Sequence, residues 1–287
     1  MANEVKVSEI SSRHIPLPMQ REIRKRCGFG CVICGLPLYE YDHLLGWANV
    51  KRHVGEEITL LCNQHHREKT AELLPIEKVR EANKTPFNLR EGVSKPYVLH
   101  YSGAECEVEI GKNLFSTRDG GHGTTLVPIS IDGTALLRFV LEDGHLLLNL
   151  NLFDEYNRLV LQILDNQLCY VPSQWDIQLT ARNLIVREAA RRILIEMVFE
   201  VPNRVVVRRG RFLRNGVEVL VGPEHVVIVN KSGRLTGNIM KNVRAGIVIG
   251  PHKPPLPGVI KMENVSRYLG DRAAVKRWVK ECFEAGC

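Results

Sequence analysis

The chain has 287 residues, of which 44% are hydrophobic and 25% are charged, and its formal net charge is +7. This length accommodates two domains of about 100–200 residues, and the composition is typical of a soluble globular protein. No apolar run reaches the ~18 residues of a membrane span and no apolar signal core follows Met1, so we expect a cytoplasmic protein with a polyanionic partner and no membrane contact.

The first predicted element is a short helix over 19–26, after an irregular start at 1–12. Four of its residues, Arg21, Arg24, Lys25 and Arg26, place cations round much of its circumference. Such a run is typical of a solvated helix face, but it is also what neutralises nucleic-acid phosphates. If the partner is a nucleic acid, the same surface is expected to include Arg13, Lys51, Arg52, Arg67 and Lys69.

Two pairs of metal-ligand residues follow. Cys31 and Cys34 form a C-x-x-C pair, and Cys62 and His65 form a C-x-x-H pair. Zinc favours four tetrahedral ligands of these types, and a loop that brings two such pairs together supplies them. We therefore predict a structural zinc ion at these four residues. The other five cysteines have no disulfide-framework spacing, which favours a reducing compartment.

The segment between the two pairs predicts a β-hairpin with strands near 39–43 and 58–61, followed by a helix that begins near Gln64. This arrangement aims His43 from a strand and His66 from a helix start at a common point. Trp47 and Val50 are expected to pack within the hairpin. His53 is expected to be an exposed loop histidine, with an accessory phosphate or metal ligand as the less favoured alternative.

These residues, taken in order, resemble the HNH motif of the ββα-metal nucleases. The resemblance covers 14–70 and rests on C-x-x-C, the dipeptide Asp42-His43, and L-C-x-x-H-H-x-x-K ending at Lys69. It implies that Asp42 and His66 bind a catalytic divalent metal, Mg²⁺ or another ion. It also implies that His43 is the general base and that the zinc is structural.

Two positions depart from the motif. Glu57 stands where the family has its middle Asn, a residue that braces a loop, so the change affects loop geometry more than chemistry. His65 stands where many members have a fourth Cys, and zinc accepts either ligand.

A transition segment separates this region from the rest of the chain. A short helix is predicted over 75–82, after which Asn83, Pro86, Asn88 and Gly92 interrupt regular structure up to Pro96. We therefore divide the chain into an HNH nuclease-like domain at 13–82, a β-rich domain at 97–250, and a Pro-rich connector with a C-terminal helix at 251–287.

Beyond Pro96 the apolar residues alternate with period two and turn signals recur every 8–12 residues or so, which suggests a sandwich, a barrel or a β-solenoid. The fold class is thus α+β, with a small zinc-stabilised domain and a larger all-β one. Strands are predicted at 97–101, 105–110, 124–131, 134–141, 145–152, 158–164, 175–180, 184–188, 192–199, 204–207, 217–221 and 225–229.

No second catalytic constellation is predicted in the β-rich region. The glycine-rich stretch 119–123 lacks the Lys-Ser/Thr ending of a phosphate loop and is interpreted as a turn. Arg204, Arg208, Arg209 and Arg211 fit phosphate contacts or the protective charges of an edge strand equally well. A final helix from Asp271 is expected to dock on the β-rich domain, with a homodimer or protein contact as the alternative.

The sequence therefore predicts a metal-dependent HNH-type endonuclease that hydrolyses phosphodiester bonds, with DNA as the expected substrate, and a β-rich domain for targeting or regulation. One alternative is a zinc-dependent nucleic-acid-binding module without catalysis. Another is a regulated effector whose β-rich domain is a platform for protein interaction or ligand sensing.

Overall fold

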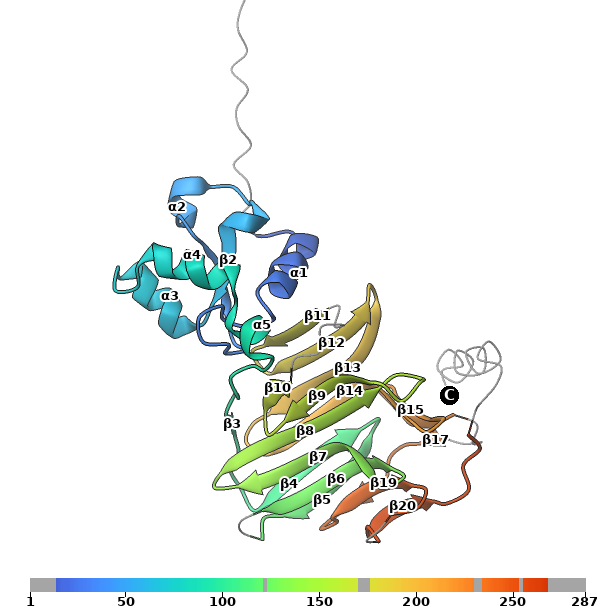
Figure 1. The fold of residues 1–287 in the computed structure, drawn as a ribbon. Helices are drawn as coiled ribbons and strands as arrows, with labels where there is room; N and C mark the ends of the chain where they lie inside the picture. The colour runs from blue at the N-terminus through green and yellow to red at the C-terminus, as the bar shows by residue number, and fades with distance from the viewer. Residues whose placement is uncertain (1–13, 121–122, 170–175, 230–233, 253–254, 268–287) are drawn as a thin grey trace, which may run out of the picture. The chain divides into compact units, whose positions relative to one another are not determined.

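The computed structural model describes residues 14–120, 123–169, 176–229, 234–252 and 255–267. The chain divides into two compact units, Met1–Lys95 and Pro96–Cys287 (Figure 1). The fold is mixed α and β and consists mainly of strands. None of the described helices is long and apolar enough to cross a membrane. The helix predicted from Asp271, the irregular start at 1–12 and the cation Arg13 lie outside the described residues.

The first unit combines a two-stranded antiparallel sheet with short helices. In the sheet, Asp42 faces Thr59 and His43 faces Ile58 across the two strands. The elements, in chain order, are α1 (Leu17–Arg26), β1 (Glu40–His43), α2 (Trp47–Val50), the 3₁₀ turn η1 (Gly55–Glu57), β2 (Ile58–Leu61), α3 (Asn63–Thr70), α4 (Ile76–Lys84) and α5 (Phe87–Glu91).

The core of this unit is small and centres on β2, whose four residues are all buried. Ile23 from α1 and Val79 from α4 pack against Leu60 and Leu61 in one cluster. Each such side chain contributes about 1.5–3 kcal/mol when it leaves water. The burial free energy of so small a cluster barely exceeds the entropic cost of ordering the chain. A bound metal is therefore expected to add to the stability of the unit.

Helix α5 ties the end of the first unit to the loop that carries Cys31 and Cys34. The Phe87 amide donates to the Val32 carbonyl over 2.9 Å, and the buried Asn88 donates from Nδ2 to the Gly28 carbonyl over 2.7 Å. Gly35 has φ +75°, and a Cβ there would lie 2.3 Å from Asn88 Oδ1, so only glycine fits. The unit therefore extends past residue 82, where the sequence predicted the nuclease-like domain to end, because α5 completes it.

The second unit contains two open sheets in the part of the chain that the structure describes. The first sheet has the order β10-β9-β8-β7-β6-β19-β20, and β3 pairs with β8. Its strands are β3 (Leu99–His100), β6 (Thr124–Ile131), β7 (Thr134–Glu142), β8 (His145–Phe153), β9 (Leu159–Leu164), β10 (Gln167–Cys169), β19 (Ala245–Ile249) and β20 (Gly258–Met262).

The second sheet has the order β11-β12-β13-β14-β15-β16-β17, with β4, β5 and β18 joined at β14. Its strands are β4 (Glu105–Ile110), β5 (Asn113–Arg118), β11 (Asp176–Thr180), β12 (Asn183–Ala189), β13 (Arg192–Glu200), β14 (Arg204–Arg214), β15 (Val217–Val221), β16 (Val226–Ile228), β17 (Arg234–Leu235) and β18 (Ile239–Met240).

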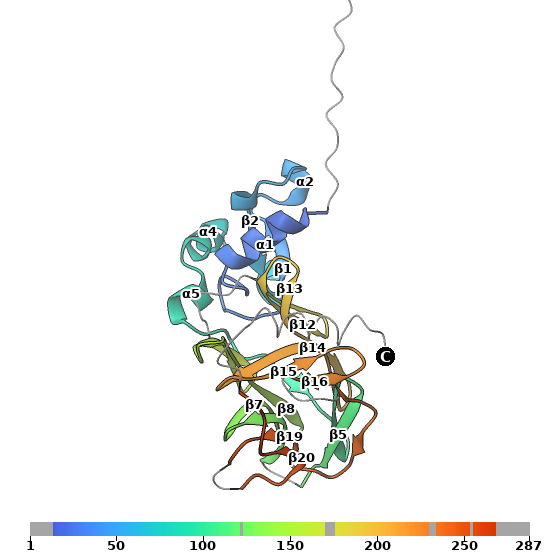
Figure 2. The same ribbon diagram turned by 90° about the vertical axis from the view of Figure 1, so that its right-hand side faces the viewer.

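The long strand β14 links the parts of this unit. Its first half, from Arg204 to Val207, pairs in parallel with β4, and its second half, from Gly210 to Arg214, pairs with β15. It also lies against β8 of the first sheet, as β5 does against β6. Figure 2 shows β7 and β8 to one side of the unit and β5 to the other. Neither sheet closes on itself among the described strands, so the barrel is not formed and two open sheets in contact take its place.

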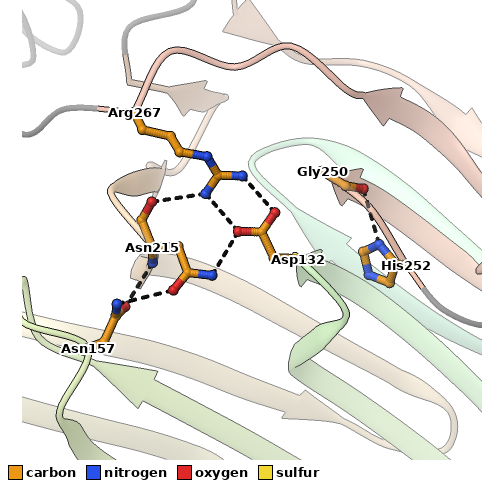
Figure 3. Close-up of polar contacts among 6 residues, drawn as sticks. All are labelled: Asp132, Asn157, Asn215, Gly250, His252 and Arg267. Carbon is orange, nitrogen blue, oxygen red and sulfur yellow. Dashed lines mark hydrogen bonds and ion pairs between the residues drawn. The ribbon is translucent and has the colours of Figure 1, made fainter.

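A polar cluster holds three turns of the second unit together with the segment after β20 (Figure 3). Arg267 donates to both carboxylate oxygens of Asp132, over 2.7 Å each, and to the backbone carbonyl of Asn215. The Asn215 side chain donates to Asp132 over 2.8 Å and accepts from Asn157. Burial raises the pKa of Asp132, but the hydrogen bonds from Arg267 and Asn215 outweigh it, so the pKa lies below its ordinary value.

The sequence predicted only a connector and a helix over 251–287. The described residues of this range instead contain β20, which pairs in parallel with β19 and extends the first sheet. Because a parallel pair joins segments without a tight turn between them, the local turn pattern gave no signal for it.

Candidate functional site

Four side chains of the first unit converge on one point. Cys31 and Cys34 lie in a turn closed by the Gly35 amide, which donates to the Cys31 carbonyl over 2.8 Å. Cys62 lies between β2 and α3, and His65 lies in the first turn of α3. The ligand atoms of the four residues all lie within 4.8 Å of one another. The cluster therefore could hold a metal ion.

The distances within this cluster fit zinc. Cys34 Sγ and Cys62 Sγ are 3.8 Å apart, and His65 Nδ1 is 3.4 Å from Cys31 Sγ and 3.2 Å from Cys62 Sγ. Tetrahedral zinc with bonds of about 2.3 Å to sulfur and 2.0 Å to nitrogen requires ligand separations of roughly 3.5–3.8 Å. Three cysteines and one histidine are also a donor set that zinc prefers. These residues fit the ion with small adjustments.

A hydrogen bond links the thiols of Cys31 and Cys34. The hydrogen bond with Cys31 lowers the pKa of Cys34 to about 5, against the burial that raises it. The same hydrogen bond, with burial, raises the pKa of Cys31 above its ordinary value. One thiolate is therefore already favoured at neutral pH, which is the form that a metal binds.

A second polar cluster surrounds the buried carboxylate of Asp42. Lys69 Nζ lies 2.7 Å from Asp42 Oδ2, and His66 Nε2 lies 3.4 Å from Asp42 Oδ1. On the other side of the His66 ring, Nδ1 is 3.7 Å from a carboxylate oxygen of Glu40. Glu40 and Asp42 are two residues apart on β1 and share one face of the strand, so they bracket the imidazole.

Adjacent histidines serve the two clusters because both belong to the first turn of α3. Successive residues of a helix are rotated by about 100°, so His65 and His66 cannot point at the same group. His65 turns toward the cysteines, and His66 turns toward Asp42 on β1. The structure thus brings Asp42 and His66 together.

Asp42 Oδ1 and His66 Nε2 lie 3.4 Å apart, so one divalent cation could contact both after a small shift. Adjacent ligands of an octahedral ion with bonds of about 2.1 Å lie roughly 3.0 Å apart. The Lys69 ammonium beside the other carboxylate oxygen supplies positive charge at the same place.

His43 is the last residue of β1 and directly follows Asp42. Its side chain is buried, and its backbone carbonyl accepts a hydrogen bond of 2.9 Å from Lys69. His43 Nε2 lies 3.2 Å from Nδ1 of His53, and Trp47 contacts both rings. His53 is therefore half-buried beside His43, whereas the sequence predicted an exposed loop residue.

An open cleft of about 1030 Å³ gives access to these groups. It lies within the first unit, where β1, the loop after it and α3 form its walls. Asp42, His43, His66 and Lys69 all line it, together with Glu40, Tyr41 and Trp47. The three residues that the sequence selected for chemistry thus face one common space.

Glu57, which stands where the sequence motif led us to expect an asparagine, forms a salt bridge with Arg52. Both carboxylate oxygens of Glu57 accept hydrogen bonds from Arg52, over 3.1 and 3.3 Å. The Glu57 carbonyl also accepts from the Leu44 amide over 2.8 Å and so ties the two ends of the loop together. The loop between β1 and β2 therefore keeps a side-chain brace at this position.

The basic residues divide into internal and exposed groups. Arg24 is buried and donates to the Tyr41 hydroxyl over 2.5 Å, and Arg26 donates to Asn83 and to the Gly55 carbonyl. These two arginines brace the unit rather than present their charge to solvent. Lys69 is committed to Asp42, and Arg21 pairs with Glu22. Of the basic residues that the sequence assigned to a nucleic-acid surface, four have exposed side chains: Lys25, Lys51, Arg52 and Arg67.

Comparison with protein-family models, with curated proteins and with solved structures finds no match to this chain.

The sequence did not identify Glu40 or the contact between His53 and His43. For Glu40 a signal was present, because a residue two positions before Asp42 on a strand shares its face. For His53 there was none, since the loop that places it has no regular period.

Proposed function

We propose that the first unit is a metal-dependent endonuclease of the HNH type that hydrolyses phosphodiester bonds, with DNA as its substrate. What carries the proposal is one arrangement: Asp42, His43 and His66 line a single cleft, and the Cys₃His cluster lies outside this set. The order of the same residues resembles the HNH motif. We also propose that Cys31, Cys34, Cys62 and His65 bind a zinc ion that stabilises the fold of the first unit.

In this mechanism, Asp42 and His66 would hold a divalent cation in the cleft. When bound, such an ion would stabilise the charge on the leaving oxygen. Glu40 holds the far side of the His66 ring, a contact that commonly orients a metal-binding imidazole. Lys69 offsets the charge of Asp42 and fixes the backbone at His43 through its carbonyl.

His43 takes a proton from a water molecule in the cleft. The resulting hydroxide attacks phosphorus in line with the leaving oxygen, the bond from phosphorus to that oxygen breaks, and the leaving oxygen gains a proton from solvent. An imidazole titrates near neutral pH, which suits a general base. The phosphates beside the scissile bond meet exposed cations of the unit, of which Lys51 and Arg67 are examples.

The test is a cleavage assay with the full-length, zinc-replete protein. Supercoiled plasmid and linear DNA are incubated with Mg²⁺ or Mn²⁺, and in parallel with EDTA added just before the DNA. We expect nicking and linearisation only with the divalent ion, and binding that weakens steeply with salt. Binding without cleavage at any metal concentration would instead favour the zinc-dependent binding module. The second unit then serves targeting or regulation in either case.

A further inference from the structure

Three side chains of the second unit form a row across adjacent strands that the proposed function does not use. Strand β3 pairs with β8, and β8 pairs with β7 (Figure 1). In these two registers, His100 faces His145 and His145 faces Glu142. Residues directly opposite each other on antiparallel strands share a face of the sheet, with Cβ atoms about 4.5–5.5 Å apart. The row therefore presents two imidazoles and one carboxylate side by side.

The row lies on the solvent face of the first sheet. His100 and Glu142 are exposed and His145 is half-buried, whereas the neighbouring strand residues Leu141 and Leu146 are buried. His145 and Glu142 border a surface hollow of about 300 Å³, and His100 borders another of about 130 Å³. Solvent and small ions therefore reach the row.

The two imidazoles contact each other and leave their nitrogens open to a ligand from solution. Their ring centroids are 5.8 Å apart, and the interplanar angle is 47°. Within the described part of the chain, neither ring forms a hydrogen bond or an ion pair, and the same holds for the carboxylate of Glu142. The row is therefore a set of polar groups that no described protein group occupies.

The separation of the two rings fits a shared metal ion. With bonds of about 2.0–2.1 Å to imidazole nitrogen, the centres of two bound rings lie roughly 5.2 Å apart at a tetrahedral angle and about 6.4 Å apart when the nitrogens are opposite. The 5.8 Å between His100 and His145 falls within this range. Rotation about the side-chain torsions can therefore aim one nitrogen of each ring at a common ion without moving the strands.

The donor types select the class of ion. Imidazole nitrogen suits Zn²⁺, Cu²⁺ and Ni²⁺, whereas Mg²⁺ and Ca²⁺ prefer oxygen ligands. Glu142 is next to His145 in the row and has a long, exposed side chain, so its carboxylate can turn toward the same ion. Water from the adjoining hollows supplies the remaining ligands.

We propose that His100 and His145, with Glu142 as a third ligand, bind a divalent transition-metal ion such as Zn²⁺. The site is separate from the Cys₃His cluster and does not depend on the nuclease function. Because it has no thiolate ligand, it holds zinc less tightly than that cluster, and extensive dialysis empties it. A bound ion ties β3, a strand of only two residues, to β8 and so stabilises the start of the second unit.

The test measures zinc uptake by the full-length protein after extensive dialysis, at about pH 7.5, where a free imidazole is mostly neutral. Equilibrium dialysis against increasing Zn²⁺ compares the wild type with His100→Asn and with His145→Asn. We expect the wild type to bind one more zinc ion per chain than either variant. Losing even a supporting contact weakens a metal site about 10–100-fold, so each variant should bind this ion at least about tenfold more weakly.

Two further variants sharpen the comparison. His252→Asn removes a histidine of another turn of the second unit and should keep the additional zinc ion. Glu142→Gln should weaken its binding, and an unchanged affinity would overturn the assignment of Glu142 as a ligand. Equal uptake by the wild type and His100→Asn would overturn the whole proposal, because the additional zinc would then bind adventitiously elsewhere.

A spectroscopic measurement identifies the ligands in the wild-type protein itself. Full-length protein with ¹⁵N-labelled histidine is titrated with Zn²⁺, and the signals of His100 and His145 are assigned by their loss in the two asparagine variants. We expect the ring nitrogens of both residues to shift together as the additional ion binds. Shifts confined to other histidines would refute the proposal. Neither measurement involves cleavage, so both decide the question even if the nuclease function fails.

Discussion

Cys34 illustrates how a single residue connects metal binding to the stability of the first unit. Its thiol has a lowered pKa and lies opposite Cys62 at the separation that a shared zinc ion requires. The buried cluster around β2 is small, so a zinc ion bound at these residues would add its binding free energy, about 10–16 kcal/mol in short zinc modules, to the free energy of folding. The ligand residues therefore do more for stability than their number suggests.

We predict one zinc ion per chain and a clear order among ligand variants. Cys34→Ser should lose the zinc and unfold the first unit, because a serine hydroxyl does not replace a thiolate. His65→Cys should keep the zinc, since zinc accepts four thiolates equally well. Elemental analysis after extensive dialysis measures the content, with Cys169→Ser of the second unit as the control. Full zinc occupancy in Cys34→Ser would contradict the assignment.

At the scale of elements, α5 determines where the first unit ends. Its Asn88 is 1% exposed and donates to the Gly28 carbonyl, and its first residue bonds to the loop that carries the cysteines. The helix therefore fixes the loop through contacts that do not involve the four cluster residues. A domain cut at residue 82 would lack this support.

Asn88→Ala should accordingly destabilise the loop that carries Cys31 and Cys34 and so weaken zinc binding. Leaving the Gly28 carbonyl unsatisfied and buried costs about 1–3 kcal/mol. Zinc release to a chromophoric chelator during urea unfolding should occur at a lower urea concentration than in the wild type. Glu91→Ala, an exposed change on the same helix, should shift the free energy of unfolding by less than about 0.5 kcal/mol. Equal midpoints for the two variants would show that α5 does not support the loop.

The cluster of Asp132, Asn215 and Arg267 makes the second unit sensitive to acid. The pKa of the Asp132 carboxyl in the folded state lies below the ordinary value of 3.8, so Asp132 binds a proton less readily in the folded state than in the unfolded one. The stability that it contributes is therefore fully present above that value and is lost as the pH falls through the lowered pKa. Asp132→Asn removes the contribution at every pH.

We therefore expect the urea midpoint of Asp132→Asn to be lower than that of the wild type at about pH 6. The two midpoints should converge as the pH falls below the ordinary pKa of 3.8 and through the lowered folded-state pKa, where the carboxylate of the wild type becomes protonated. The circular dichroism of the sheets reports the unfolding. Asp143→Asn, an exposed change in another turn of the unit, is the control. A difference between Asp132→Asn and wild type that stayed constant down to low pH would contradict this account.

Local patterns predicted much of the secondary structure and little of its pairing. The strands 105–110, 124–131 and 217–221 have the bounds expected from alternation and from their flanking turns. Asn113–Arg118 was missed because its polar residues obscure the period. Strand β14 was expected to end at Val207 but continues through Arg208 and Arg209 to Arg214, since its second half pairs with β15. Such partners are set by segments far away in the sequence.

In the candidate site, too, local patterns predicted some features and could not predict others. Ligand spacing identified Cys31, Cys34, Cys62 and His65, because two short turns suffice to present two pairs. The position of His53 depends instead on the short segment between α2 and η1, in the connection from β1 to β2. The Glu57 and Arg52 pair and contacts with Trp47 fix this connection. No local propensity encodes that conformation, so the contact with His43 could be found only in the structure.

For the whole molecule, the division between Lys95 and Pro96 implies that the second unit folds without the first. It has a core of its own that includes the fully buried Phe115, Phe139 and Phe212. A protein of residues 96–287 should give circular dichroism of the β type and unfold cooperatively with heat. A spectrum dominated by helix, or one without a transition, would show that the unit depends on the rest of the chain.

The nuclease account as a whole depends most directly on His43, so the decisive measurement compares His43→Ala with the wild-type protein in Mg²⁺. Cleavage should fall by about 10²–10⁴-fold, the usual contribution of a positioned general base. The affinity for DNA and its salt dependence should change little, because phosphate contacts from other residues govern both. Zinc content should stay the same, because His43 lies outside the Cys₃His cluster. Cleavage at the wild-type rate with matched metal and salt would contradict the central claim.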